Sequence, residues 1–140
     1  MMVMSSASKK LKLYTGSRKT ARATASVCPG VGRVRVNGFL LEALPNELSR
    51  EIIMAPLRLA GDSRYKVNID VDVKGGGYVG QAEASAMAVA KALVGYFKSS
   101  DLKKRIVEYD EHLISGDARQ SEPKKFGGPG ARRREQKSYR

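Results

Sequence analysis

Cysteine, histidine and tryptophan are almost missing from this 140-residue sequence, which has one cysteine, one histidine and no tryptophan. A lone Cys28 excludes a disulfide framework and a cysteine-based metal site, and His112 stands in no pattern typical of a metal centre or a catalytic nucleophile. No apolar run approaches the roughly 20 residues that a membrane-spanning helix requires. We therefore expect one soluble, cytosolic domain with no cofactor and no membrane partner.

The first residues lack the apolar segment and the small-residue cleavage site of a secretory signal. Residues 1–12 are instead Ser-rich, basic and free of acids. A transit peptide is one interpretation of that composition, but the informative pattern begins at once near Leu13. We expect residues 1–12 to be a flexible basic N-terminus.

Acidic residues are scarce at both ends of the chain. The net charge is +12 and the isoelectric point about 10.0. Residues 1–35 carry eight bases and no acid, residues 36–116 ten bases and eleven acids, and residues 117–140 eight bases and three acids. A near-neutral middle between basic ends suits a polyanion partner. Two solvated tails without a partner are the alternative, and a membrane surface is disfavoured because the tail lacks the bulky apolar residues of an interfacial helix.

Alternation of small apolar and polar residues predicts three strands and a hairpin turn. Residues 20–27, 33–36 and 65–74 each place every second side chain on one face, which is the period of a half-buried strand. Asn37-Gly38 suits the two positive-φ positions of a type I′ turn, with residues 39–41 as the short returning strand.

Helical patterns separate and follow these strands. Asn46 is a plausible N-cap, and Pro56 predicts a break at Ala55, followed by a short turn to Ala60 that Gly61 closes. The apolar stripe expected for this helix is Leu48, Ile52 and Ile53.

Two further helices are expected after the third strand. An alanine-rich segment, residues 81–98, predicts a helix lying close on the sheet, and Ser100 caps a last helix. Periodicity stops beyond Gly116. The sequence thus predicts an α+β domain over residues 13–116 and an extended basic arm over residues 117–140.

A glycine run between strand and helix is the most suggestive motif for chemistry. Residues 75–80 (GGGYVG) have the geometry by which backbone amides and a helix N-terminus hold a phosphate. The run matches neither a P-loop nor a dinucleotide fingerprint. A contact with a phosphate backbone, a tight structural turn and the loop of a small phosphate-handling enzyme all remain open. Asp70 and Asp72 could be paired carboxylates, but a solvated strand face is the simpler interpretation, so we expect no enzyme.

The basic residues point to RNA in combination. Arg offers a planar fork and Lys a mobile charge for phosphate oxygens. The sequence contains no recognition helix for a major groove and no wedge residues of a DNA-architectural protein, which favours an irregular RNA surface. The candidate RNA contacts are Arg18, Lys19, Arg22, Arg33, Arg35, Gly75, Gly76, Gly77, Lys124, Lys125, Arg132, Arg133 and Arg134.

Seven segments of the sequence carry a further signal. They are residues 15–23 (TGSRKTARA), 32–38 (GRVRVNG), 56–57 (PL), 73–84 (VKGGGYVGQAEA), 117–119 (DAR), 122–125 (EPKK) and 137–140 (KSYR). These segments resemble the universal small-subunit ribosomal protein number nine family, occur in the family's order and span essentially residues 13–140. The ending KSYR resembles the archaeal and eukaryotic cytosolic branch, whereas bacterial members end in Lys-Arg. Ser17 departs from the pattern, since many members carry another base there.

The resemblance implies a fold, a location and partners. The implied fold is a two-layer α/β sandwich with a left-handed crossover, the type shared with the second domain of small-subunit ribosomal protein five, although crossovers are generally right-handed. The implied location is the head of the small subunit of the cytoplasmic ribosome, with rRNA and neighbouring head proteins as partners. The arm is expected to reach P-site tRNA through Lys137, Tyr139 and Arg140. Certain kinases use the same fold with a glycine-rich loop, so a small phosphate-handling enzyme is the alternative function.

Overall fold

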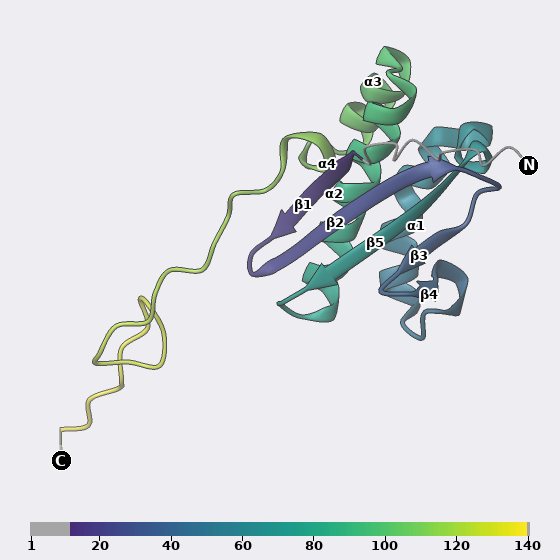
Figure 1. Ribbon diagram of the computed structural model, residues 1–140. Coiled ribbons are helices and arrows are strands. Elements are labelled where there is room, and N and C mark those ends of the chain that lie inside the picture. The colour runs from purple at the N-terminus through teal and green to yellow at the C-terminus, as the bar shows by residue number, and fades with distance from the viewer. Residues whose placement is uncertain (1–11, 140) are drawn as a thin grey trace, which may run out of the picture.

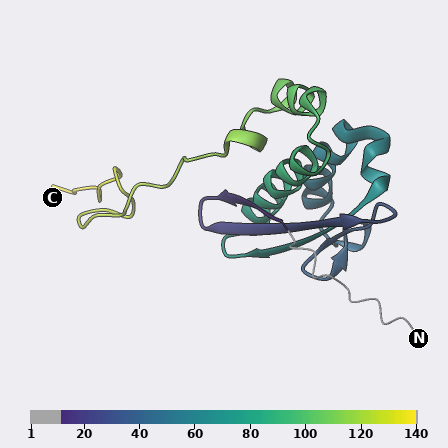
Figure 2. The same cartoon turned by 45° about the horizontal axis from the view of Figure 1, so that its top comes forward.

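A computed structural model describes residues 12–139, in which one sheet is covered on one face by helices (Figures 1 and 2). The strands are β1 (Leu13–Arg18), β2 (Ala21–Pro29), β3 (Val34–Val36), β4 (Phe39–Leu40) and β5 (Val67–Lys74). The helices are α1 (Glu47–Ala60), α2 (Tyr78–Phe97), α3 (Ser100–Tyr109) and α4 (His112–Ser115), with 3-10 turns η1 (Leu41–Ala43) and η2 (Gly61–Lys66).

The sheet has the strand order β1-β2-β5-β3-β4. All neighbouring pairs are antiparallel except β3 and β5, which are parallel. The chain therefore crosses over from β3 through α1 to β5. This mixed architecture confirms the α+β class.

The alternating segments are confirmed as strands with one buried face. The inward residues of β2, β3 and β5 lie between the sheet and the helices, and α2 presents its alanines to them. Small side chains on both sides let the helix approach closely. The buried strand residues are Ala21, Ala23, Ala25, Val27, Val34, Val36, Val67, Ile69, Val71 and Val73.

Strand β1 was not predicted, because small residues hide its alternation. Gly16 is buried where β1 crosses α2, and a Cβ there would lie 2.8 Å from the Ala88 nitrogen. The residue that faces the helix must therefore lack a side chain. A strand whose inward position is glycine gives no apolar period to detect.

The expected break at Ala55 is wrong, since α1 continues through Pro56 to Ala60. Proline removes a helical hydrogen bond and typically costs about 3 kcal/mol in a helix interior. Pro56 is buried on the face that packs against α2, so burial offsets that cost. Leu48 is also misplaced: it is 52% exposed, and Ser49 occupies the buried stripe with Ile53 and Leu57 instead.

Helix ends follow the expected capping chemistry with small shifts. The Asn46 side chain accepts hydrogen bonds from two backbone N–H groups of α1, as predicted. Helix α2 begins at Tyr78, three residues earlier than expected. The cap of α3 is Ser99 rather than Ser100, and its Oγ accepts from the Leu102 nitrogen at 3.3 Å. The four-residue helix α4 was not predicted.

The predicted hairpin turn is confirmed by the φ angles of Asn37 (51°) and Gly38 (83°). The Asn37 side chain also accepts a hydrogen bond from the Val73 nitrogen at 2.9 Å, which ties the turn to β5.

Beyond Gly116 the described chain holds no helix and no strand up to residue 139. Figure 1 shows this segment leading away from the domain as an irregular extension. None of the helices within residues 12–139 has the length and apolar character needed to cross a membrane.

Candidate nucleic-acid interface

The glycine run makes a tight turn against the β1–β2 hairpin. Gly75 and Gly76 have φ angles of 79° and 69°, a region that side chains disfavour. A Cβ on Gly75 would lie 2.6 Å from the carbonyl oxygen of Thr20. The structural-turn interpretation is therefore confirmed, and the turn brings the start of α2 beside the hairpin tip.

A hollow of about 340 Å³ lies between the hairpin tip and the start of α2. Residues 18–20 line one side, and residues 76–80 line the other. Glu83 also lines the hollow, but its carboxylate is paired with Arg18. Gly77 caps α2 without a side-chain hydrogen bond, and the first turn carries no acid. The first N–H groups of a helix lack partners within it and form its positive end, so this hollow suits a phosphate oxygen.

Two further bases lie at the same end of the sheet. Arg22 of β2 and Lys74 of β5 are cross-strand partners, and both are exposed on the face opposite the helices. We call Lys19, Arg22, Lys74 and residues 75–80 the glycine-turn corner. It combines three exposed cations with a helix N-terminus.

The rest of the open sheet face is of mixed charge. Arg35 is exposed on β3 beside Asp70 of β5, and Asp72 follows two residues later. Arg33 is exposed just before β3. The acids of β5 thus offset part of the charge of Arg35, which leaves the glycine-turn corner as the more positive end of the face. Asp70 and Asp72 lie on a solvated strand face, as the simpler interpretation predicted.

Arg18 differs from the other candidates because two carboxylates hold it. Its Nε donates to Glu83 Oε2 at 2.8 Å, and its Nη1 lies 3.2 Å from Asp117 Oδ2. Only 14% of the side chain is exposed. A role for Arg18 in RNA binding stays a prediction, but its charge is already compensated within the protein.

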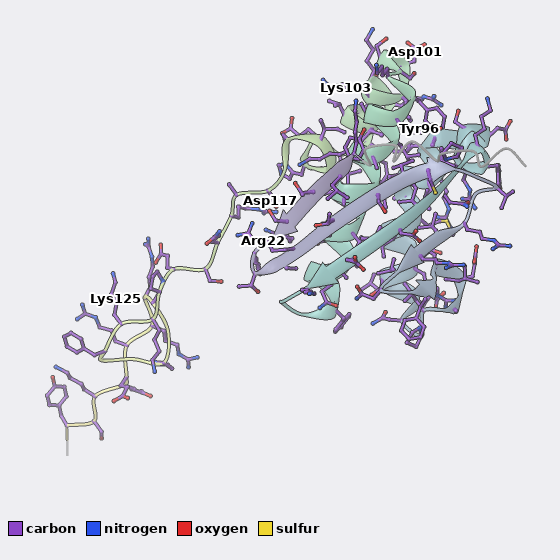
Figure 3. The ribbon with its side chains drawn as sticks, in the orientation of Figure 1. Arg22, Tyr96, Asp101, Lys103, Asp117 and Lys125 are labelled. Atoms are coloured by element: carbon purple, nitrogen blue, oxygen red, sulfur yellow. The ribbon has the colours of Figure 1, made fainter. Side chains whose placement is uncertain are left out.

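Asp117 joins the domain to the following segment. Its carboxylate accepts from the Arg119 side chain at 2.6 Å and from the Arg119 backbone nitrogen at 3.0 Å. The side-chain hydrogen bond from Arg119, then its backbone hydrogen bond, hold the pKa of Asp117 well below its usual range, and the nearby charge of Arg18 adds to this. We call Arg18, Glu83, Asp117 and Arg119 the arm clamp. In Figure 3, Arg22 and Asp117 lie at the same end of the sheet, so the arm leaves beside the glycine-turn corner.

The arm divides into paired and unpaired bases. Arg132 forms two hydrogen bonds with Glu122, at 2.9 and 2.8 Å, and these lower the pKa of the Glu122 carboxyl. Across residues 12–139, no carboxylate forms an ion pair with the remaining candidate bases of the arm. Tyr139 is 91% exposed, and Arg140 lies outside the described residues. The unpaired bases are Lys124, Lys125, Arg133, Arg134 and Lys137.

Sequence analysis predicted the exposed bases but not the acids that pair with some of them. Glu83 and Asp117 lie far from Arg18 in the chain, so no pattern of neighbouring residues predicts the arm clamp. The described residues hold no group of three or more metal-ligating side chains. The candidate site is therefore a surface of cations and backbone amides.

Comparison with known proteins identifies the family. A family model described as ribosomal protein S9/S16 matches residues 16–140. A small ribosomal subunit protein uS9 from Desulfurococcus amylolyticus is 49% identical over 131 residues, which cover 94% of each chain. The uS9 protein of Pyrobaculum aerophilum is 47% identical, covering 94% of this chain and 92% of its own, and that of Halobacterium salinarum is 46% identical, covering 90% and 96%. The chain therefore belongs to the ribosomal protein S9/S16 family, with relatives in archaea.

Proposed function

We propose that this chain is a structural protein of the small ribosomal subunit of the cytoplasmic ribosome, sits in the subunit head and binds rRNA there. The observation that carries the proposal is the placement of uncompensated cations. Lys19, Arg22 and Lys74 lie together at the glycine-turn corner without an ion-pair partner among residues 12–139, and five bases of the arm are likewise unpaired. Arg18, which lies between the corner and the arm, is instead held by two carboxylates. Phosphate contacts of this kind supply most of the non-specific affinity for nucleic acid. Membership of a ribosomal protein family favours this function over the enzyme alternative.

The globular domain, residues 13–116, would dock one RNA backbone at the glycine-turn corner. The α2 N-terminus offers backbone N–H groups, and Lys19, Arg22 and Lys74 offer side-chain charge to neighbouring phosphates. Arg33 and Arg35 would contact RNA from the open sheet face. Neighbouring head proteins and the N-terminal residues 1–12, of which 1–11 lie outside the described residues, would complete the assembly.

The arm, residues 117–140, would continue from this docking site to the P-site tRNA. Lys124, Lys125, Arg133 and Arg134 would bind rRNA on the way, with Arg132 contributing if it leaves Glu122. Lys137, Tyr139 and Arg140 would meet the tRNA. Two observations support this proposal. The described part of the tip is exposed, and the arm clamp attaches the arm to the domain at one point.

We also infer that the crossover from β3 through α1 to β5 is left-handed. In Figure 1 the helices lie behind the sheet, β5 lies to the left of β3, and both strands run toward the lower left. That path winds in the left-handed sense, which supports the two-layer fold that the family resemblance implies.

Co-sedimentation tests the main proposal. The tagged chain should sediment with small subunits through a gradient, remain bound in moderate salt and leave only in high salt, because many phosphate contacts are lost together. A chain that stays at the top of the gradient at every salt concentration would contradict the ribosomal role. Equilibrium dialysis of the full chain with ATP tests the enzyme alternative, for which saturable ATP binding is required.

A further inference from the structure

Phe126 is a large apolar residue displayed in the most basic part of the chain. Its exposure is 103%, so it has as much solvent contact as in an extended peptide. Phe126 follows Lys124 and Lys125 directly and precedes Gly127. An apolar side chain with this exposure does nothing for the fold, because it contacts none of the core.

The segment that displays Phe126 is closed on itself. Arg132 and Glu122 form a two-bonded pair across it, and the Glu135 nitrogen donates to the Gly127 carbonyl oxygen at 3.0 Å. Gly128 is buried, and a Cβ there would overlap the carbonyl oxygen of Arg133. We call residues 122–135 the arm loop, which is visible in Figure 1 as the folded part of the extension. These hydrogen bonds restrict the backbone around Phe126, so the arm loop would lose less conformational entropy when Phe126 binds a ligand.

Phe126 shares the lining of one hollow with four cations. This hollow, of about 840 Å³, is lined by Lys125, Phe126, Arg133, Arg134 and Lys137. Glu135 also lines this hollow, and Glu122 is occupied by Arg132. The ring thus lies in a strongly positive setting, which suits a ligand with an apolar face and negative charge on both sides.

An unpaired nucleobase has that chemistry. Its π-face stacks on an aromatic ring in a sequence-tolerant way, and its flanking phosphates are anionic. A protein partner would have to be acidic around an apolar pocket. A lipid surface would require an amphipathic helix, which residues 122–135 do not form.

We propose that Phe126 stacks on an unpaired base of the RNA, while Lys125, Arg133 and Arg134 hold the adjoining phosphates. This assignment rests on the proposed function, since it takes the arm as an RNA-binding segment. It adds a base contact to a segment whose other contacts are electrostatic.

Substitution of Phe126 in the full chain tests the stacking. Phe126→Leu keeps the apolar volume but removes the ring, and Phe126→Tyr keeps the ring. With single-stranded oligoadenylate as probe, Phe126→Leu should bind at least about five-fold more weakly, and Phe126→Tyr should bind as the parent does. Duplex RNA, whose bases are already stacked, should show little change. The slope of affinity against salt should be unaltered, because no charge is removed. Phe39→Leu is the matched control, since Phe39 is 64% exposed on the domain, away from the arm.

Fluorescence gives a second readout. The chain contains no tryptophan, so Phe126→Trp introduces a single reporter. Oligoadenylate should quench its emission more than duplex RNA at equal phosphate concentration. Equal affinities of the parent and Phe126→Leu for oligoadenylate, or no quenching by either RNA, would overturn the proposal and leave a protein neighbour as the occupant. Deletion of residues 117–140 separates the RNA-binding role of the arm from the stacking of Phe126. If the deletion leaves RNA affinity unchanged, the arm does not bind RNA. If the deletion weakens RNA binding but Phe126→Leu does not, only the stacking is overturned.

Discussion

Arg18 and Asp117 hold the base of the arm against the edge of the sheet. Nη1 of Arg18 lies 3.2 Å from Oδ2 of Asp117, and the two residues also form an isolated parallel β-bridge. Because β1 is the edge strand, the bridge gives it a partner at one residue on its outer side. Both a backbone and a side-chain contact therefore set the direction in which the arm leaves the domain.

Removing the Asp117 carboxylate should loosen the arm without unfolding the domain. In Asp117→Asn, Arg18 keeps Glu83 but loses its second partner, and Arg119 loses its pair. We expect trypsin to cut after Arg119 several-fold faster than in the parent, because the bond becomes more mobile. Glu122→Gln is the control: it breaks the pair with Arg132 inside the arm and should leave cleavage at Arg119 unchanged. Equal cleavage rates in the parent and Asp117→Asn would contradict a clamp.

The clamp should also persist into acid. The pKa of Asp117 is lowered in the folded protein, chiefly by the hydrogen bond from the Arg119 side chain. A lowered pKa favours the folded contact above the unfolded value of about 3.9, and the contact is lost only as the pH falls through the lower folded value. Cleavage at Arg119 should therefore stay slow from pH 8 down to about 4.5, compared with Asp117→Asn at each pH. A rise in cleavage of the parent between pH 7 and 5 that the variant lacks would mean that the pKa of Asp117 lies above the unfolded value rather than below it.

The glycine turn should tolerate a side chain at Gly77 but not at Gly75. Gly75→Ala forces alanine to a φ of 79° and brings its Cβ within 2.6 Å of the Thr20 oxygen. We expect a loss of about 1–3 kcal/mol in the free energy of unfolding, measured with urea. Gly77→Ala is the matched control, since nothing lies within 4 Å of its Cβ and its φ is −87°. If both variants lose the same free energy of unfolding, the effect does not come from the strained turn at Gly75 but from the conformational entropy of the unfolded chain.

Sequence patterns predicted the parts of the fold that depend on neighbours in the chain. The alternation in β2 and β5, the Asn37-Gly38 turn and the Asn46 cap all rest on residues within a few positions of each other. The Pro56 break failed because packing of α1 on α2 offsets a local penalty. The exposed bases were predictable for the same local reason, but their pairing was not, because Glu83 and Asp117 approach Arg18 only after folding.

Pairing within the arm should determine which bases contribute to RNA affinity. Lys124 and Lys125 are exposed without an ion-pair partner among residues 12–139, whereas Arg119 and Arg132 are each paired with an acid. In the full chain, Lys124→Gln with Lys125→Gln should make the slope of log affinity against log salt shallower by about 1.4–1.8, or about 0.7–0.9 per phosphate contact. Arg119→Gln with Arg132→Gln removes the same charge and should change the slope less, because those guanidiniums must first leave Asp117 and Glu122. Equal changes in the two pairs of variants would mean that the ion pairs dissolve on binding.

The tip of the arm should matter for tRNA more than for assembly. The final residues are Lys137, Ser138, Tyr139 and Arg140, and within the described part Lys137 and Tyr139 are exposed. Truncation before Lys137 should leave incorporation into subunits nearly intact, because the glycine-turn corner and the arm loop remain. It should weaken P-site tRNA binding by about 1–3 kcal/mol, the range of a few charge-assisted hydrogen bonds.

Filter binding of tRNA to purified subunits carrying the truncated chain measures this difference, with Lys124→Gln/Lys125→Gln subunits as the control for general loss of charge. If truncated and parent subunits bind tRNA equally, the tip contacts rRNA instead.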